Sequence, residues 1–259
     1  MKISEGELMK HIERKNHTMV KMLIDRFKFD IHYNNEEIFK CACEFSIIPI
    51  IKLLIDKYPN INYKIGNGCI LIKACKCQQI EVIELLMEKF PDIINKHVVN
   101  EIMLNICRYD QDNIFELFIN KYPDTQKYIE YDVMFINAGI FGSLSILKIL
   151  YQNNYINEYC KMHVDTIFGI SAYYGYFDIL KWLVDRFDID YHENCEYAFR
   201  CACDSGNMEI LLWLKQKFPD INHHVLNDWC YRHTKNSEIL DWLKHECPAP
   251  LLTKSARKN

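Results

Sequence analysis

Large apolar residues recur along the chain at a nearly constant step, and the same pattern of residues precedes each of them. We call these residues the anchors. Apolar residues also stand three and four places before each of these anchors, which is the i, i+3, i+4 stripe of an amphipathic helix. The steps between successive anchors are 31, 32, 32, 32, 33, 31 and 29 residues. The anchors are Leu23, Leu54, Leu86, Phe118, Leu150, Leu183, Leu214 and Leu243. A period near 33 built from two short helices predicts a stack of repeats, in which each unit buries its apolar face against its neighbours.

A short polar residue seven places before the anchor predicts where this second helix begins, because its side chain can accept a hydrogen bond from a free backbone N–H group. In four units it is Asn16, Ser143, Asn207 or Asn236. An aromatic residue followed by proline predicts where the helix ends, since proline cannot continue a helix and the next residue favours a turn. We expect an extended connection after each such turn. The turns are Tyr58-Pro59-Asn60, Phe90-Pro91-Asp92, Tyr122-Pro123-Asp124 and Phe218-Pro219-Asp220.

Upstream of each second helix the pattern predicts a first helix, with a large apolar residue fifteen places before the anchor and small residues twelve and eleven places before it. The small residues let the paired helices approach closely. The large residues are Phe39, Leu71, Met103, Phe135, Phe168 and Phe199. Gly142, Gly175 and Gly206 predict the end of the first helix, because glycine adopts a left-handed conformation at no steric cost. Other units place Ser46, Gln78 or Asp110 at that position.

The unit from Ala202 to Leu214, with its small pair, its Gly206-Asn207 step and a following Asp220-Ile221-Asn222, resembles the ankyrin repeat. The resemblance covers roughly residues 4 to 247. The chain departs from the family in lacking the T-P-L-H-x-A opening and in replacing the glycine of the turn by an aromatic residue and proline. The resemblance implies an all-α ankyrin-repeat solenoid of about eight helix-turn-helix units with short extended turns.

Capping repeats are expected at both ends, because the outer face of a terminal repeat meets water. We expect residues 1–33 to form an N-terminal capping repeat, 34–224 the ankyrin-like repeats, 225–247 a C-terminal capping repeat and 248–259 a tail. The abundance of Ile, Asn and Lys, together with the aromatic-proline turn, looks like the ankyrin-repeat proteins of giant DNA viruses of the mimivirus type.

Composition narrows the classes of partner. A formal charge of −4 and a pI near 6.2 argue against a surface that binds nucleic acid, which usually carries a basic stripe. The start of the chain has no apolar run after its first charges, so no secretory signal is expected. The most apolar stretch, Ser46 to Ile55, is shorter than the roughly 20 residues of a membrane helix. We therefore expect neither a nucleic acid nor a membrane as partner.

Twelve cysteines suggest a metal site until their positions are considered. Pairs such as Cys41/Cys43, Cys75/Cys77 and Cys201/Cys203 are two residues apart, so they point to different sides of a helix, and the chain has no C-x-x-C pair. Most of the cysteines fall at equivalent places in successive repeats, which is typical of small buried residues in a reducing compartment. No nucleophile elbow or phosphate loop is present. We expect no metal, no cofactor and no enzymatic activity.

Two further features are interpreted as structural. Trp182, Trp213 and Trp242 each stand one place before an anchor, and we expect them to pack between repeats near the C-terminal end. The neighbouring acids Glu36 and Glu37 are expected to form a solvated helix start.

One set of equivalent positions in successive repeats suggests a binding surface. In ankyrin-type stacking, the two residues before the end of the first helix face the concave surface, so aromatic residues there would meet solvent. Exposed aromatic clusters are typical of partner-binding surfaces. The alternative, that degenerate turns fold over and bury these rings, stays open. The candidates are Phe45, Tyr109, Phe141, Tyr173 and Tyr174.

The leading hypothesis is a monomeric, non-enzymatic scaffold in the cytoplasm that binds a partner protein through its concave face and turn tips. If the viral resemblance holds, the partner is a host protein. One alternative is an adaptor that recruits substrates to a ubiquitin ligase, although Pro248 to Asn259 are too few for an F-box-like module. Another alternative is a metal or redox sensor that uses the cysteines.

Overall fold

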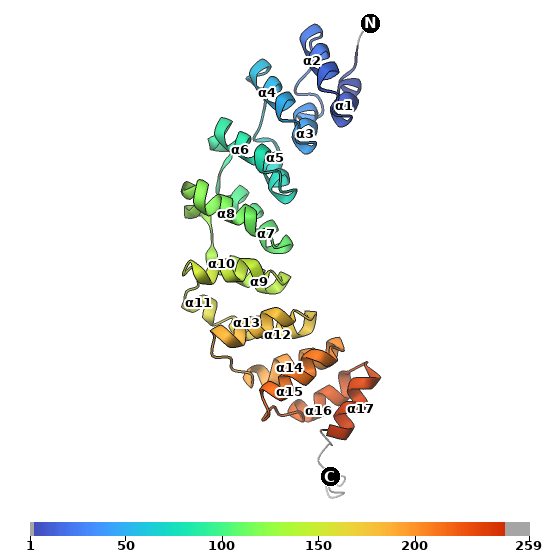
Figure 1. Cartoon of the computed structure of the whole chain (residues 1–259), viewed down its shortest axis with the longest axis vertical. Helices are drawn as coiled ribbons and strands as arrows, with labels where there is room; N and C mark the ends of the chain where they lie inside the picture. The colour runs from blue at the N-terminus through green and yellow to red at the C-terminus, as the bar shows by residue number, and fades with distance from the viewer. Residues whose placement is uncertain (1–2, 247–259) are drawn as a thin grey trace, which may run out of the picture. The chain divides into compact units, whose positions relative to one another are not determined.

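A computed structural model describes residues 3–246, apart from the side chains of residues 193–195 and 246. The chain divides into two compact units, Met1–Glu130 and Tyr131–Asn259. Each unit is a stack of antiparallel helix pairs (Figure 1), and no strand occurs in the described part of the chain. The all-α repeat architecture predicted from the sequence is therefore confirmed. The predicted tail, residues 248–259, lies outside the described residues.

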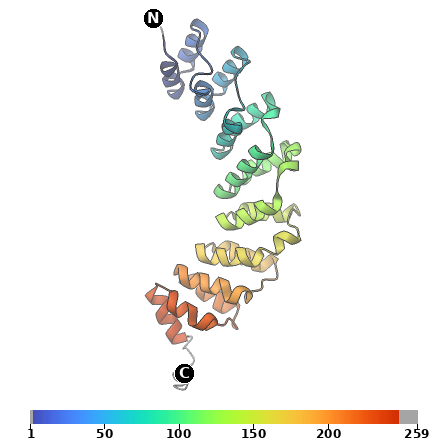
Figure 2. The same ribbon diagram turned by 180° about the vertical axis from the view of Figure 1, so that it is seen from behind.

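In the first unit, successive helices of the chain belong alternately to two layers. The first helices of the pairs follow one another side by side, and so do the second helices, as Figures 1 and 2 both show. The first helices are α1 (Glu5–Glu13), α3 (Glu37–Glu44), α5 (Ile65–Lys76) and α7 (Lys96–Tyr109). The second helices are α2 (His17–Arg26), α4 (Ile48–Lys57), α6 (Ile80–Lys89) and α8 (Asp112–Lys121), joined by the short 3-10 helices η1 (Pro91–Ile93) and η2 (Pro123–Tyr128).

The second unit repeats this arrangement. Its first helices are α9 (Tyr131–Phe141), α12 (Val164–Tyr174), α14 (Glu193–Ser205) and α16 (Val225–His233). Its second helices are α10 (Leu144–Gln152), α13 (Phe177–Arg186), α15 (Met208–Lys217) and α17 (Ser237–Glu246), with a one-turn helix α11 (Glu158–Lys161) in the connection after α10.

Burial of the anchors confirms the register of the repeats. All eight anchor side chains are buried, and seven of them are completely inaccessible to solvent. The large apolar residues of the first helices are buried as well, from Phe39 to Phe199. Each repeat therefore contributes at least one side chain from each of its helices to the core of its own unit.

The predicted helix starts are mostly confirmed. The side-chain oxygens of Asn16 and Asn207 accept hydrogen bonds from the backbone of Met19 and Ile210. Asn236 caps α17 in the same way. Ser143 also precedes its helix, α10, but its buried hydroxyl makes no capping hydrogen bond there.

The predicted ends of the first helices are confirmed and extend to units without glycine. Gly142, Gly175 and Gly206 all have φ of +80°. Ser46 and Gln78 have φ of +55° at the same position, and Asp110 has φ of +49°. A side chain in this left-handed region costs about 1–2 kcal/mol, so the chain keeps the turn geometry even where the sequence does not favour it.

Replacing Ser46 by glycine is therefore expected to stabilise the first unit by about 0.5–1 kcal/mol, because glycine relieves the left-handed strain and repays part of that gain as backbone entropy. Denaturant unfolding followed by circular dichroism measures the change. Ser205→Gly is the matched control: Ser205 ends a right-handed helix, and the same replacement there should lower stability. Equal signs for the two variants would contradict the assignment of strain to Ser46.

The proline turns end the second helices as predicted. Helices α4, α6, α8 and α15 each stop at a lysine directly before the aromatic residue of the turn. Two of the connections differ from the expected extended form, because the residues from Pro91 and from Pro123 wind into η1 and η2. The fixed φ of proline suits the first turn of a helix, which explains the difference.

A turn of left-handed backbone stands at the start of several first helices, where the ankyrin family has its T-P-L-H opening. Three successive residues have φ between +46° and +80° in each of three such turns. The turns are Asn34-Asn35-Glu36, Gly66-Asn67-Gly68 and Leu226-Asn227-Asp228. The right-handed helix begins only after them, at Cys69 in α5 and at Trp229 in α16.

Three tryptophans were expected to pack between repeats, and two of them do so. Trp182 is buried and its ring lies 5.8 Å from that of Tyr151, in the preceding repeat. Trp213 reaches back in the same way, with its ring 5.4 Å from that of Phe177. Each ring therefore joins a second helix to the repeat before it, and Trp242 is only half-buried.

Candidate functional site

The five aromatic candidates lie at the carboxyl ends of first helices, and none of them is buried. Tyr109, Tyr173 and Tyr174 are exposed, with 45%, 42% and 59% of their surface accessible. Phe45 and Phe141 are half-buried. These exposures favour the hypothesis of solvent-facing rings over the alternative that the turns bury them.

Three tyrosines form a cluster at the end of α12, which we call the tyrosine cluster: Tyr173, Tyr174 and Tyr176. The ring of Tyr174 stacks on that of Tyr176 at 5.7 Å, and the ring of Tyr173 meets Tyr174 edge-on at 5.1 Å. Tyr176 in turn lies against Gly142, where an added Cβ would come within 2.7 Å of the ring. Because Gly142 has no side chain, the ring of Tyr176 can pack there. Tyr176 in turn supports the exposed ring of Tyr174.

In the first unit, Tyr109 stands beside a cation. The Nζ atom of Lys76 lies 5.4 Å from the centre of the Tyr109 ring, a cation–π distance. Gln111, which is buried, donates a hydrogen bond to the backbone carbonyl of Lys76 and ties α8 to the end of α5. Tyr109 therefore presents an exposed ring beside a lysine cation.

Most of the described cysteines form part of the core, whereas Cys69 is half-buried and Cys77 is exposed. Burial raises the pKa of Cys41 and of Cys201 to about 11, that of Cys107 to about 12 and that of Cys43 still further. A thiol must lose its proton to act as a nucleophile or a metal ligand, so these residues are poorly suited to either role. Among residues 3–246, no cluster of three His, Cys, Asp or Glu side chains could hold a metal ion. The side chain of Cys195 and all of Cys247 lie outside the described residues.

The structure gives the aromatic-proline turn a role that its sequence pattern does not reveal. The ring of Tyr63 stacks on that of Phe90 at 4.0 Å, and its hydroxyl donates to the carboxylate of Asp92 at 2.8 Å. Tyr191 repeats the arrangement in the second unit with Phe218 and Asp220. The turn therefore presents a ring and an acceptor to a tyrosine almost a full repeat earlier in the chain.

Glu36 is not solvated, contrary to the expectation from sequence. Only 2% of its surface is accessible, and its Oε1 atom lies 2.5 Å from Nδ1 of His32 and accepts a hydrogen bond from the backbone N–H of Asn62. The equivalent Glu196 binds His192 and Asn222 in the same way, at 2.7 and 3.2 Å. The buried carboxylate satisfies a backbone donor of the next repeat, which is why the acid lies inside.

The other ring nitrogen of each histidine, Nε2, has a different neighbour in the two sites. Nε2 of His32 faces the side-chain amide of Asn60, whereas Nε2 of His192 lies 3.4 Å from the carboxylate of Asp220. The hydrogen bond to Glu196 and the neighbouring Asp220 raise the pKa of His192. In contrast, burial and the nearby Lys215 lower the pKa of His223 to about 4.

The two histidines are therefore expected to change stability in opposite pH windows. Because the pKa of His192 in the folded chain lies above 6.5, its contribution is complete below pH 6.5 and is lost as pH rises through the folded value. The pKa of His223 is depressed, so its contribution is present above pH 6.5 and is lost as pH falls toward 4. Histidine NMR titration checks both, and a His192 that titrates below His223 would contradict the assignment.

The transmembrane question has a direct answer for the described part of the chain: none of its helices combines the length and the apolar character needed to cross a bilayer.

Stacked helix pairs around a core in each unit define a helical-repeat protein, and left-handed residues end several of its first helices in the same way. Comparison with known proteins finds similarity to ankyrin repeats. Residues 8–100 match the family model described as ankyrin repeats in three copies. A protein of Acanthamoeba polyphaga mimivirus that is named as an ankyrin repeat protein is 30% identical over 109 residues, which are 40% of this chain and 16% of the relative.

Residues 8–100 are thus similar to ankyrin repeats, and part of the chain is similar to an ankyrin repeat protein of a mimivirus. Ankyrin repeats serve as scaffolds for protein–protein interactions and are generally not enzymes. The match covers a small part of the mimivirus protein, so its own activity and partners are not transferred to this chain.

Proposed function

We propose that this chain is a monomeric, non-enzymatic scaffold that binds a partner protein through the exposed ends of its first helices and the tips of its turns. The observation that carries the proposal is the tyrosine cluster. Tyr173 and Tyr174 are exposed side by side at the end of α12, and Tyr176 holds them in place. Large rings that already occupy one arrangement bury much apolar area on binding at a low cost in conformational entropy.

In the first unit, Tyr109 with Lys76 is a separate exposed aromatic surface, and the half-buried Phe45 and Phe141 would contribute less area. The mimivirus relative supports a host protein as the partner, in the reducing cytoplasm of the infected cell. Eight of the ten described thiols are buried, which favours this scaffold over a cysteine-based sensor. No observation in residues 3–246 favours an adaptor for a ubiquitin ligase.

Proximity labelling in Acanthamoeba cells tests the proposal. The double variant Tyr173→Ala/Tyr174→Ala is expected to lose labelled proteins that the unmodified chain retains, because interface tyrosines often contribute 2 kcal/mol or more each, a loss of roughly 30-fold or more in affinity. Tyr159→Ala is the matched control, since Tyr159 is an exposed tyrosine of the same unit that lies on α11. Circular dichroism must be unchanged in both variants. An identical set of labelled proteins for all three chains would overturn the proposal.

A further inference from the structure

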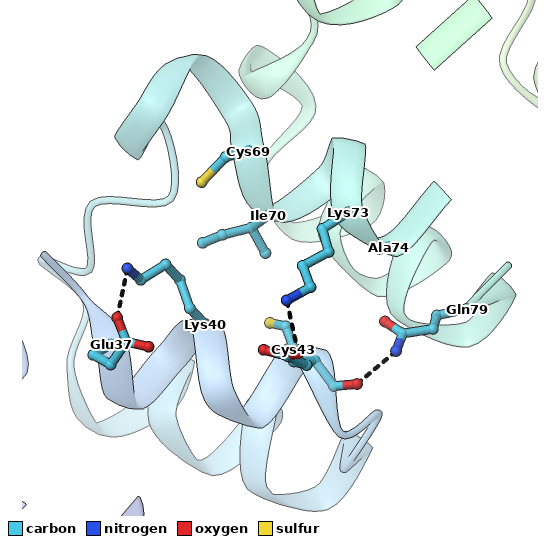
Figure 3. Close-up of a pocket in the computed structure, with 9 residues that line it drawn as sticks. Glu37, Lys40, Cys43, Cys69, Ile70, Lys73, Ala74 and Gln79 are labelled. Carbon is cyan, nitrogen blue, oxygen red and sulfur yellow. Dashed lines mark hydrogen bonds and ion pairs between the residues drawn. The ribbon is translucent and has the colours of Figure 1, made fainter. Parts of the chain in front are cut away.

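A cavity of about 190 Å³ opens between the first helices α3 and α5. Its floor consists of the buried side chains of Cys43, Ile70 and Ala74. Lys40 and Lys73 stand at its rim, each paired with a glutamate, at 2.7 Å in both cases. Figure 3 shows Cys69 and Ile70 of α5 directed from one side toward Lys40 and Cys43 of α3 on the other.

We propose that this cavity is a socket for one aromatic side chain, tyrosine or phenylalanine, of the partner protein. The inference rests on the proposed function, because the socket lies on the first helices of a scaffold. Sites for small molecules usually measure about 300–1,000 Å³. A cavity of 190 Å³ is smaller than these and suits a single side chain.

The equivalent place in the second unit is filled by the chain itself. Tyr197 lies seventeen residues before its anchor Leu214, just as Cys69 lies seventeen before Leu86. The ring of Tyr197 covers Gly169, where an added Cβ would come within 2.1 Å of it. Both Cys69 and Tyr197 directly follow a residue of left-handed backbone, Gly68 and Glu196. Gly169 stands fourteen residues before Leu183, the position that Lys40 has before Leu54. Tyr197 therefore packs on a glycine where the socket has a lysine, and the small Cys69 leaves the space beside that lysine open.

A cation at the rim selects an aromatic occupant. Lys40 stands fourteen residues before its anchor, the position that Arg200 has before Leu214. The guanidinium of Arg200 lies 5.4 Å from the ring centre of Trp229, which begins the right-handed part of α16. Between α14 and α16, the position of Lys40 therefore holds a cation that lies over an aromatic ring. In the socket the cation is present and the ring is missing, so an aromatic ring complements it in charge as well as in shape.

The probe for this proposal is p-cresol, which is the side chain of tyrosine with a hydrogen atom in place of the backbone. A ligand of eight heavy atoms is expected to bind in the millimolar range. In protein labelled at isoleucine methyl groups, p-cresol should shift the Ile70 signal in a saturable way, and its saturated analogue 4-methylcyclohexanol should bind more weakly. The absence of a shift at about 20 mM p-cresol, or equal affinities for the two compounds, would overturn the proposal.

Two variants locate the site. Cys69→Tyr places a large side chain at the cavity and should abolish the shift. Lys40→Met keeps the bulk and removes the cation, so p-cresol should bind about 2- to 5-fold more weakly. Lys52→Met, an exposed lysine on α4, is the control and should leave the affinity unchanged. Undiminished binding to both Cys69→Tyr and Lys40→Met would place p-cresol elsewhere and overturn the proposal.

The socket and the scaffold fail separately. If p-cresol does not bind while the labelled proteins depend on Tyr173 and Tyr174, the socket is wrong and the scaffold stands. If p-cresol binds with the predicted selectivity while those tyrosines have no effect on labelling, the socket is supported and the proposed surface of the second unit is wrong.

Discussion

Replacing Leu86 by alanine is expected to lower the free energy of unfolding of the first unit by about 2–5 kcal/mol. Leu86 is completely buried at the core of α6, and truncation removes apolar contacts and leaves a cavity that the surrounding helices fill only partly. In a stack of repeats the loss also weakens the interfaces with the repeats on either side, because neighbours supply each other's core. Urea unfolding followed by circular dichroism, with hydrogen exchange to locate the loss, measures it.

The control for this prediction is an exposed leucine in the same kind of helix. Leu212 lies on α15 with 46% of its surface accessible, so Leu212→Ala should change stability by no more than about 0.5 kcal/mol. Equal losses for Leu86→Ala and Leu212→Ala would mean that the register of the repeats is wrong.

Replacing Gly169 by alanine is expected to destabilise the second unit by about 1–3 kcal/mol, although alanine normally favours a helix over glycine by up to about 1 kcal/mol. The added Cβ would lie 2.1 Å from Cδ1 and 2.4 Å from Cε1 of Tyr197, so α12 and α14 must move apart or the ring must turn away. Thermal or urea unfolding measures the net effect, in which overpacking outweighs helix propensity.

Two further variants separate these opposing effects. Gly6→Ala places its Cβ 3.9 Å from the Ser4 hydroxyl, in ordinary contact, so helix propensity alone should act and the variant should be as stable as the parent or more so. Adding Tyr197→Ala to Gly169→Ala should cost less than the two single changes together, because the clash is removed. A Gly169→Ala variant more stable than the parent would show that the helices are not in the close contact described.

Much of the fold could be predicted because its signals are local. The i, i+3, i+4 stripe, the polar cap and the proline stop each act within a few residues, so the anchors and most of the helix boundaries follow from them. Gly142 and its equivalents predicted the ends of first helices for the same reason. Ser46 and Asp110 adopt the same backbone, because the packing of the repeat outweighs their own preference.

The candidate site could be predicted only in part. The column position singled out Tyr109, Tyr173 and Tyr174, and their exposure agrees with it. The support of Tyr174 by Tyr176 was missed, because Tyr176 belongs to the loop after the helix and depends on Gly142, in the preceding repeat. The cavity beside Cys69 was missed too. A signal for it was present in the sequence, since a cysteine stands where another repeat has Tyr197.

The sequence by itself determined the repeat, its period, its two helices and the residues that fill its core, since these follow from periodicity and from local backbone preferences. Only the tertiary structure decided which residues meet across repeats: the burial of Glu36 against the backbone of Asn62, the stacking of Tyr63 on Phe90 and the space beside Cys69. The physical reason is that these pairs join different repeats, and their energies depend on how closely the helices of neighbouring repeats approach. In the sequence, a polar residue at such a position looks like a surface residue and a small one looks like a spacer. Their partners come within contact distance only when the repeats stack.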